Sequence, residues 1–262
     1  YGRAMPYPFG HFGVTPERLL IRMYMVDEGL FGSLLQVAQT YIGLFVLFGA
    51  FLTVIGASEA LTKIGLALSG QYAGGPAKVA AIASGLTGMI SGTAAANVAT
   101  TGTLTVRMMQ RVGLKPYFAG AVEAIASTGG LIMPPIMGAA AFLVAEFVGI
   151  PYSVVVIGAI IPALLYYGSL MLVIHIRAVK LGIAGLPRSE IPSLREILIH
   201  RGHLLIPIAV LLWMLLDGRT PTWAAMMSIL AALAVSFLRR ATRLTPQRFV
   251  DGLVNGAAAA VP

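Results

Sequence analysis

The first residues that could bind a ligand lie in the apolar stretch 79–106, where hydroxyl-bearing and small residues gather. Ser91-Gly92-Thr93 stands at its centre, and Asn97 follows. If this stretch turns back within a membrane, each arm of about 13 residues is about 20 Å long and brings the turn near the bilayer midplane. Backbone carbonyls with Ser, Thr and Asn oxygens suit a hard cation such as sodium, while the amides that open the second arm suit an anion. The alternative is close helix packing, because Gly88 and Gly92 form a G-x-x-x-G pair.

A second group lies at 127–135, where four small residues precede Pro134 and Pro135. Prolines and glycines interrupt a helix, because proline removes a backbone donor and clashes with the preceding turn. At membrane depth the freed backbone groups must be buried in protein or line a cavity, which in transporters is commonly a substrate or ion site. We therefore predict a broken helix, with a plain proline kink as the alternative.

Together these groups define the candidate site, and no catalytic residue is expected. The predicted ion-binding or substrate-binding residues are Ser91, Gly92, Thr93, Asn97, Ser127, Thr128, Gly129, Gly130, Pro134 and Pro135. The hydroxyls of Ser91, Thr93, Ser127 and Thr128 carry no fixed charge, which suits a desolvated sodium ion better than a transition metal. Sodium as a coupling ion is the sole cofactor expected.

Glu123 precedes Ser127 by one helical turn and would share a helix face with it. It could assist a cation or a proton; the alternative is a carboxylate near the cytoplasmic end that Lys115 or water satisfies. Glu146 is expected to be solvated. The sequence lacks the residues of common enzyme sites: it has no H-E-x-x-H, no G-x-S-x-G and no cysteine. An enzyme is therefore not predicted.

The composition determines which elements position these residues. Of the 262 residues, 58% are hydrophobic and 11% are charged, and the mean hydropathy is +0.86. This excludes a soluble enzyme and predicts an all-α polytopic membrane protein, with room for roughly six to eight spanning helices. The net charge of +8 must be read by position, because Lys and Arg residues indicate which side of the membrane each loop occupies. The charge gives no support to nucleic-acid binding.

Charge-free and proline-rich intervals divide the chain into segments. We expect an extracytoplasmic or interfacial segment (1–33), a spanning helix with an interfacial amphipathic connection (34–78), a re-entrant hairpin (79–112), a broken helix (113–150), a spanning helix (151–180), a cytoplasmic interfacial connection (181–200), two spanning helices (201–240) and the start of a further helix (241–262). The chain starts without an initiator Met and stops as a helix begins, so we expect a piece of a longer protein, with a complete processed chain as the alternative.

The basic residues favour the hairpin. If residues 79–106 leave and re-enter on one side, 14 of the 18 Lys and Arg residues share that side, which is then cytoplasmic. The other four are Arg3, Arg18, Arg22 and Arg219. A single crossing would instead place Lys63 and Lys78 on the opposite side of the membrane from all the later basic loops.

Three stretches make the sequence recognisable: EGLFGSLLQVAQTYIGLFVLFGAFL, GGPAKVAAIASGLTGMISGTAAANVATTG and FAGAVEAIASTGGLIMPPIMGAAAFL. It resembles the large membrane subunit of tripartite ATP-independent periplasmic (TRAP) transporters, most closely the fused permeases that join small and large subunits in one polypeptide. The resemblance runs from about Glu28 to Leu186 and more weakly to the end. Asn97 departs from the acidic residue that many large subunits have there, which bears on the local ion chemistry.

The resemblance implies an elevator-type secondary transporter with two inverted repeats, each with a re-entrant hairpin and a broken helix in a mobile domain. This chain resembles the first repeat, and 241–262 would open the second. The family uses a sodium gradient, not an ATPase, and takes an organic anion from an extracytoplasmic binding protein at a bacterial or archaeal cytoplasmic membrane. We expect sodium-coupled uptake of a small organic acid, a carboxylate. The alternatives are a proton-coupled transporter that uses Glu123 and a membrane scaffold without a substrate path.

Overall fold

A computed structural model of the chain describes residues 8, 13–26, 29–239 and 242–260. Within these ranges the regular structure is helical, and no strand occurs. The basic residues Arg3 and Arg240 lie outside the described residues. The α-helices are α1 (Pro16–Tyr24), α2 (Ser33–Val37), α3 (Gly43–Val54), α4 (Ala57–Ser69), α5 (Gly75–Ser91), α6 (Ala94–Arg111), α7 (Pro116–Gly129), α8 (Ala139–Val148), α9 (Tyr152–Lys180), α10 (Leu194–Arg201), α11 (Ile206–Leu216), α12 (Pro221–Ser236) and α13 (Pro246–Ala260).

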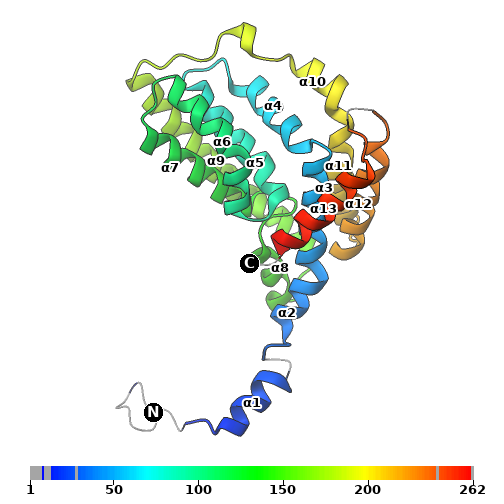
Figure 1. Cartoon of the computed structure of the whole chain (residues 1–262). Coiled ribbons are helices and arrows are strands. Elements are labelled where there is room, and N and C mark those ends of the chain that lie inside the picture. Colours follow the sequence, from blue (N-terminus) through cyan, green and yellow to red (C-terminus); the bar gives the residue numbers. More distant parts are fainter. Residues whose placement is uncertain (1–7, 9–12, 27–28, 240–241, 261–262) are drawn as a thin grey trace.

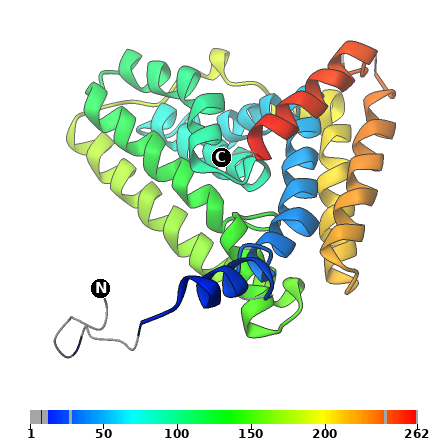
Figure 2. The same cartoon turned by 60° about the horizontal axis from the view of Figure 1, so that its bottom comes forward.

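The helices form two groups that meet along α5 and α3 (Figures 1 and 2). In the first group α5, α6, α7 and α9 pack together; in the second, α3, α11 and α12 stand side by side, with α13 lying across α3. Helix α4 packs along α5 and also contacts α10. Helix α1 lies away from both groups and buries none of its residues.

Three helical stretches are long and apolar enough to cross a membrane: Leu35–Val54, Tyr152–Lys180 and Arg188–Leu216. The first contains a π-helical segment, Ala38–Ile42, and α8 and α12 are shorter apolar helices. This agrees with the predicted all-helical, polytopic class. The first of the two spanning helices predicted at 201–240 starts earlier, because α10 and a 3₁₀ turn lead into α11 without a break. Helix α10 therefore occupies part of the predicted connection at 181–200.

Helices α5 and α6 form a hairpin (Figure 1). The turn is at Gly92, whose φ of +67° is a left-handed conformation that L side chains disfavour, and Thr93 caps α6 by accepting a hydrogen bond from the Ala96 amide (3.3 Å). The stretch therefore forms two helices and not one continuous helix. Pro76 in the first turn starts α5 at Gly75 rather than at the predicted residue 79. The arms of 17 and 18 residues are about 26 Å long.

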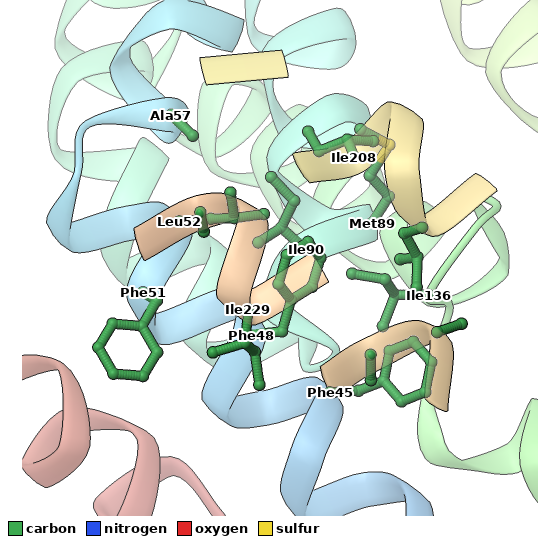
Figure 3. Packing of buried hydrophobic residues seen from close by; sticks show 14 of the residues in the cluster. Phe45, Phe48, Phe51, Leu52, Ala57, Met89, Ile90, Ile136, Ile208 and Ile229 are labelled. Atoms are coloured by element: carbon green, nitrogen blue, oxygen red, sulfur yellow. The ribbon is translucent and has the colours of Figure 1, made fainter. Parts of the chain in front are cut away.

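The hairpin tip packs into the larger of two apolar clusters (Figure 3). Met89 and Ile90 near the end of α5 lie in one cluster with Phe45 and Phe48 of α3 and with Ile136 beyond α7. Ala77, Ala80 and Ala81 near the start of α5 belong to a second cluster, with α7 and α9. In a membrane such contacts stabilise the protein by van der Waals packing, so the close fit of apolar side chains holds both ends of α5 in place.

An ion-pair network links α4 to α10. The Glu59 carboxylate accepts from Arg201 (2.6 Å) and lies 2.9 Å from the Lys63 ammonium. These two cations lower the pKa of Glu59 below its usual value. All three side chains are at least 32% exposed, so the pairs contribute at most about 1 kcal/mol each. Their effect is to fix where α10 meets α4.

The hairpin predicts a labelling pattern in a cysteine-free background of the full-length protein. Gln71→Cys, just before α5, and Gln110→Cys, in the last turn of α6, should react with a membrane-impermeant maleimide from the same side. Both residues are exposed and lie at the open end of the hairpin. Glu146→Cys, exposed on α8 beyond the helix break, should react from the opposite side. Labelling of Gln71→Cys and Gln110→Cys from opposite sides would contradict the re-entrant hairpin.

Candidate ion and substrate site

The helix after the hairpin is broken where the sequence predicts it. Helix α7 ends at Gly129, a 3₁₀ turn covers Gly130–Ile132, and α8 begins at Ala139. Between them the Pro134–Pro135 bond is cis and Met137 has a φ of 60°. The plain proline kink is therefore wrong, because residues 133–138 separate two distinct helices.

The hairpin and the broken helix touch through backbone. Gly88 of α5 faces Gly130, and a Cβ added to Gly88 would lie 2.7 Å from the Cα of Gly130. The tip also approaches the second half of the break, since a Cβ on Gly92 would lie 3.7 Å from the Met137 carbonyl oxygen. The structure thus brings Gly92 and Gly130 of the predicted site to one region.

Both interruptions line one cavity of about 80 Å³, together with residues of α3. This exceeds the roughly 10–15 Å³ that one water molecule needs. Its wall is mainly apolar, with Phe45 and Phe142 on one side, and its polar groups come from the tip. The cavity therefore offers a small ligand few but localised polar contacts.

Ser91 and Thr93 supply the hydroxyls of this cavity. Ser91 is half-buried, and its Oγ lies within donor distance of the carbonyls of Gly88 (3.4 Å) and Thr93 (3.2 Å). As a donor in both contacts, this oxygen keeps its lone pairs for a ligand. The adjacent N-terminus of α6 carries the positive end of the helix dipole, which favours an anion.

The other two predicted sodium ligands lie elsewhere. Ser127 Oγ is buried and donates to Glu123 (3.3 Å), while the exposed Thr128 donates to the Ala124 carbonyl (2.8 Å). Ser127 also lies 3.4 Å from Ser84, seven residues and about 10 Å along α5 from Ser91. Oxygens around one hard cation lie within about 2.6 Å of it. The structure therefore does not bring the four predicted hydroxyls into a single sodium site.

Asn97 joins the two arms of the hairpin rather than facing its tip. The side chain is fully buried. Its Oδ1 accepts from Thr87 (2.7 Å) and its Nδ2 donates to the Ser84 carbonyl (2.8 Å). Both contacts are with α5, so the amide ties α6 to α5 along their length.

Three tyrosine hydroxyls of α9 donate to backbone carbonyls near the broken helix, a feature that the sequence analysis missed. The bonds run from Tyr152 to Pro135 (3.1 Å) and Ile136 (2.6 Å), from Tyr166 to Ile125 (2.8 Å) and from Tyr167 to Ala126 (2.7 Å). The tyrosine hydroxyls thus satisfy carbonyls that flank or lie within the helix break. Tyrosines in the apolar stretch of α9 were the available signal, because a buried tyrosine hydroxyl usually needs a partner.

Glu123 lies at the centre of a buried cluster of hydroxyls. The expectation that Lys115 or water satisfies it is wrong. Its Oε1 accepts from Ser84 (2.9 Å), Thr101 (2.5 Å) and Ser127 (3.3 Å), and its Oε2 accepts from Thr105 (2.6 Å). The Glu123 side chain is 1% exposed. We call these five residues the Glu123 cluster; it joins α5, α6 and α7.

The apolar helices indicate a multi-pass membrane protein, and a small cavity lies between its two helix breaks. Residues 7–261 match the tripartite ATP-independent periplasmic transporter, DctM component. The chain belongs to this family, which comprises transporter permeases and not enzymes. The resemblance to the large membrane subunit of TRAP transporters is thereby confirmed.

Relatives of the chain support the assignment. It is 30% identical over 206 residues to the C4-dicarboxylate TRAP transporter large permease protein DctM of Pseudomonas aeruginosa, covering 77% of this chain and 47% of that protein. The protein of the same name from Vibrio cholerae is 26% identical over 178 residues, 63% of this chain and 38% of that protein. An uncharacterized protein of Sinorhizobium fredii is 26% identical over 193 residues, 72% and 45% of the two chains. The chain spans less than half the length of these relatives.

The glycine contact between α5 and the break predicts a large effect of one methyl group. Gly88→Ala should lower the free energy of unfolding by about 1–3 kcal/mol, because its Cβ would clash with the Gly130 backbone and the Asn97 amide. The matched control is Gly120→Ala in α7, where a Cβ meets nothing within 4 Å. Thermal unfolding in detergent measures both variants. Equal midpoints for Gly88→Ala and the parent would contradict the close approach.

Proposed function

We propose that this chain forms half of the transport site of a sodium-coupled transporter that takes up small organic acids, with C4-dicarboxylates as the substrate class. Family membership and the names of the relatives in Pseudomonas aeruginosa and Vibrio cholerae support this substrate class. The observation that carries the proposal is the cavity shared by the hairpin tip and the broken helix. In transporters such breaks place backbone and hydroxyl groups where a ligand replaces water.

Sodium is proposed at the tip, where Ser91 and Thr93 bring neutral oxygens to the cavity. The backbone of Gly92 and Met137 lines the same space. Hard cations prefer such oxygen ligands, and the described cavity lining contains no nitrogen or sulfur ligand other than Met137. These groups replace the predicted set of four hydroxyls, because Ser127 and Thr128 do not line the cavity.

The substrate carboxylates are proposed to meet the first turn of α6. The amides there point toward the tip and carry the positive end of the helix dipole. No Lys or Arg occurs among the described residues that line the cavity. Bound sodium and helix amides would therefore supply the positive charge, so that substrate binding depends on sodium.

The rest of the site is proposed to come from a second hairpin and broken helix outside this chain, in an elevator-type transporter. We infer a bacterial or archaeal cytoplasmic membrane, a binding protein that delivers the substrate from outside the cell, and a small membrane subunit fused in the same full-length polypeptide. The family match supports the binding protein and the small subunit, because the family name denotes a tripartite periplasmic system. The stretches that resemble fused permeases support the fusion of the small subunit.

The sodium proposal predicts the effect of one hydroxyl. In the full-length protein in proteoliposomes, Ser91→Ala should raise the sodium concentration for half-maximal dicarboxylate uptake by about 5-fold to 150-fold, the range for a lost contact of roughly 1–3 kcal/mol. Ser169→Ala is the matched control, because this hydroxyl is exposed on α9 and donates to the carbonyl of Tyr166 on the same helix.

Two outcomes would count against the proposal. Unchanged sodium dependence in Ser91→Ala, with normal membrane insertion, would remove this hydroxyl from the ion site. Uptake by the parent protein that proceeds equally without sodium would reject sodium coupling itself.

A further inference from the structure

The Glu123 cluster is a built polar site inside an apolar bundle. Glu123, Ser84, Thr101, Thr105 and Ser127 are each at most 4% exposed. Two hydroxyls come from α6, one comes from α5, and one lies on α7 with Glu123 itself. A buried carboxylate in a membrane protein is costly and is retained where it has a task. The proposed sodium site at the hairpin tip does not use it.

No cation balances the Glu123 carboxylate among the described residues. None of the described salt bridges includes it. Helix α9 packs on α7 and presents Tyr167, whose hydroxyl donates to the Ala126 carbonyl (2.7 Å). The charged or basic side chains on or beside the packed helices are Lys78 on α5, Arg107 and Arg111 on α6, Lys115 before α7, and His175, Arg177 and Lys180 on α9. The carboxylate therefore relies on neutral hydroxyls.

The geometry can satisfy both protonation states. When the carboxyl is ionised, each hydroxyl donates its proton to a carboxylate oxygen. Thr105 Oγ1 also lies 2.9 Å from the Thr101 carbonyl, and Thr101 Oγ1 lies 2.9 Å from the Asn97 carbonyl. Each threonine can thus turn its proton to its own helix and accept from a carboxylic acid. A proton added at Oε2 would be donated to Thr105 Oγ1, whose proton turns to the Thr101 carbonyl.

We propose that Glu123 is a proton-binding site, in which one proton joins the carboxylate at Oε2 while the Thr105 hydroxyl reverses its donor direction. The distances favour a proton over a metal ion. The carboxylate and hydroxyl oxygens lie 2.5–3.3 Å apart, the range of hydrogen bonds. Oxygens that share a hard cation at about 2.3–2.6 Å each are held farther apart than the shorter of these contacts.

A route for the proton runs through Thr101. This residue lies at the edge of a groove of about 530 Å³ between α4 and α6, whose polar wall includes Glu59, Thr62 and Thr100. On its other side Thr101 Oγ1 is 2.5 Å from Glu123 Oε1. Thr101 therefore lies between the groove and the carboxyl group, and a proton that enters from the groove would reach Oε1 through this residue.

The proton site links pH to the fit of the hairpin on α7. Ionised Glu123 accepts hydrogen bonds from hydroxyls of α5, α6 and α7, whereas in the acid form the Thr105 proton turns to a carbonyl of α6. The hydrogen bonds between the helices therefore change from charge-assisted to neutral with one proton. Its effect on transport rests on the proposed function, but the proton site itself does not.

Infrared difference spectroscopy tests the site directly on the purified full-length protein in lipid. We expect a carboxylic-acid carbonyl band that titrates with pH and is absent in Glu123→Gln. Glu146→Gln is the matched control, because Glu146 is exposed on α8. Thr105→Val should shift the band, since it removes the acceptor of the acid proton, whereas Thr103→Val, exposed on the same helix, should leave it in place. No Glu123 band at any pH at which the parent is folded would overturn the proposal.

Uptake in proteoliposomes gives a second readout. One linked proton changes an equilibrium by up to about tenfold per pH unit, and this component of the pH profile should disappear in Glu123→Gln but persist in Glu146→Gln. A parent-like profile in an active Glu123→Gln variant would overturn the proposal. If Glu123→Gln does not fold, the band shift in Thr105→Val decides. Sodium-independent uptake by a parent that shows the Glu123 band would reject only the sodium proposal.

Discussion

The structure depends on one constraint: a polar group buried among apolar side chains must find its hydrogen-bond partner within the protein. Within the described ranges, no buried side-chain nitrogen or oxygen lacks one. Interrupting a helix at the prolines frees carbonyls, and placing a carboxylate in the same bundle adds a charge. The freed carbonyls and the carboxylate lie in α7 and the segment after it, and neighbouring helices supply their hydrogen-bond donors. The positions of α5, α6 and α9 follow from this requirement as much as from apolar packing.

Helix α9 has a role that its composition conceals. It is apolar enough to face lipid along much of its length, yet its tyrosines reach carbonyls on both sides of the helix break. Tyr152 also stacks on Phe142 of α8 with ring centroids 4.4 Å apart. One continuous helix therefore holds α7, the break and α8 in a fixed relation, which a chain interrupted by Pro134 and Pro135 could not maintain alone.

Local signals predicted the outline of the fold. Ser91-Gly92-Thr93 marks the hairpin turn because a left-handed residue and a helix cap are needed at adjacent positions, and the two prolines mark the break. Start points were less accurate, since Pro76 lengthens α5 beyond the charge-free interval that suggested its boundary. The polar contacts were not predictable in this way. Ser84 meets Glu123 across 39 residues, and Tyr167 meets Ala126 across 41.

The same limit explains the division of the candidate site. Ser91 and Ser127 each stand beside a helix interruption, so the sequence suggested a common ligand. Helices α5 and α7 run in the same direction, with Ser84 beside Ser127 and Gly88 beside Gly130. That parallel register places Ser91 two helical turns beyond Ser127. Spacing within a helix was predictable, but the register between two helices was not.

The contact between Gly88 and Gly130 has a mechanical consequence. Neither residue has a side chain, and the gap between them is too narrow for a single added carbon. If α5 slid along its axis relative to the break, residues with side chains would enter that gap and force the backbones apart. Shear between these two elements is thus blocked, whereas displacement of both as one rigid body costs nothing at this contact. The glycine pair therefore makes the hairpin tip and the helix break move together.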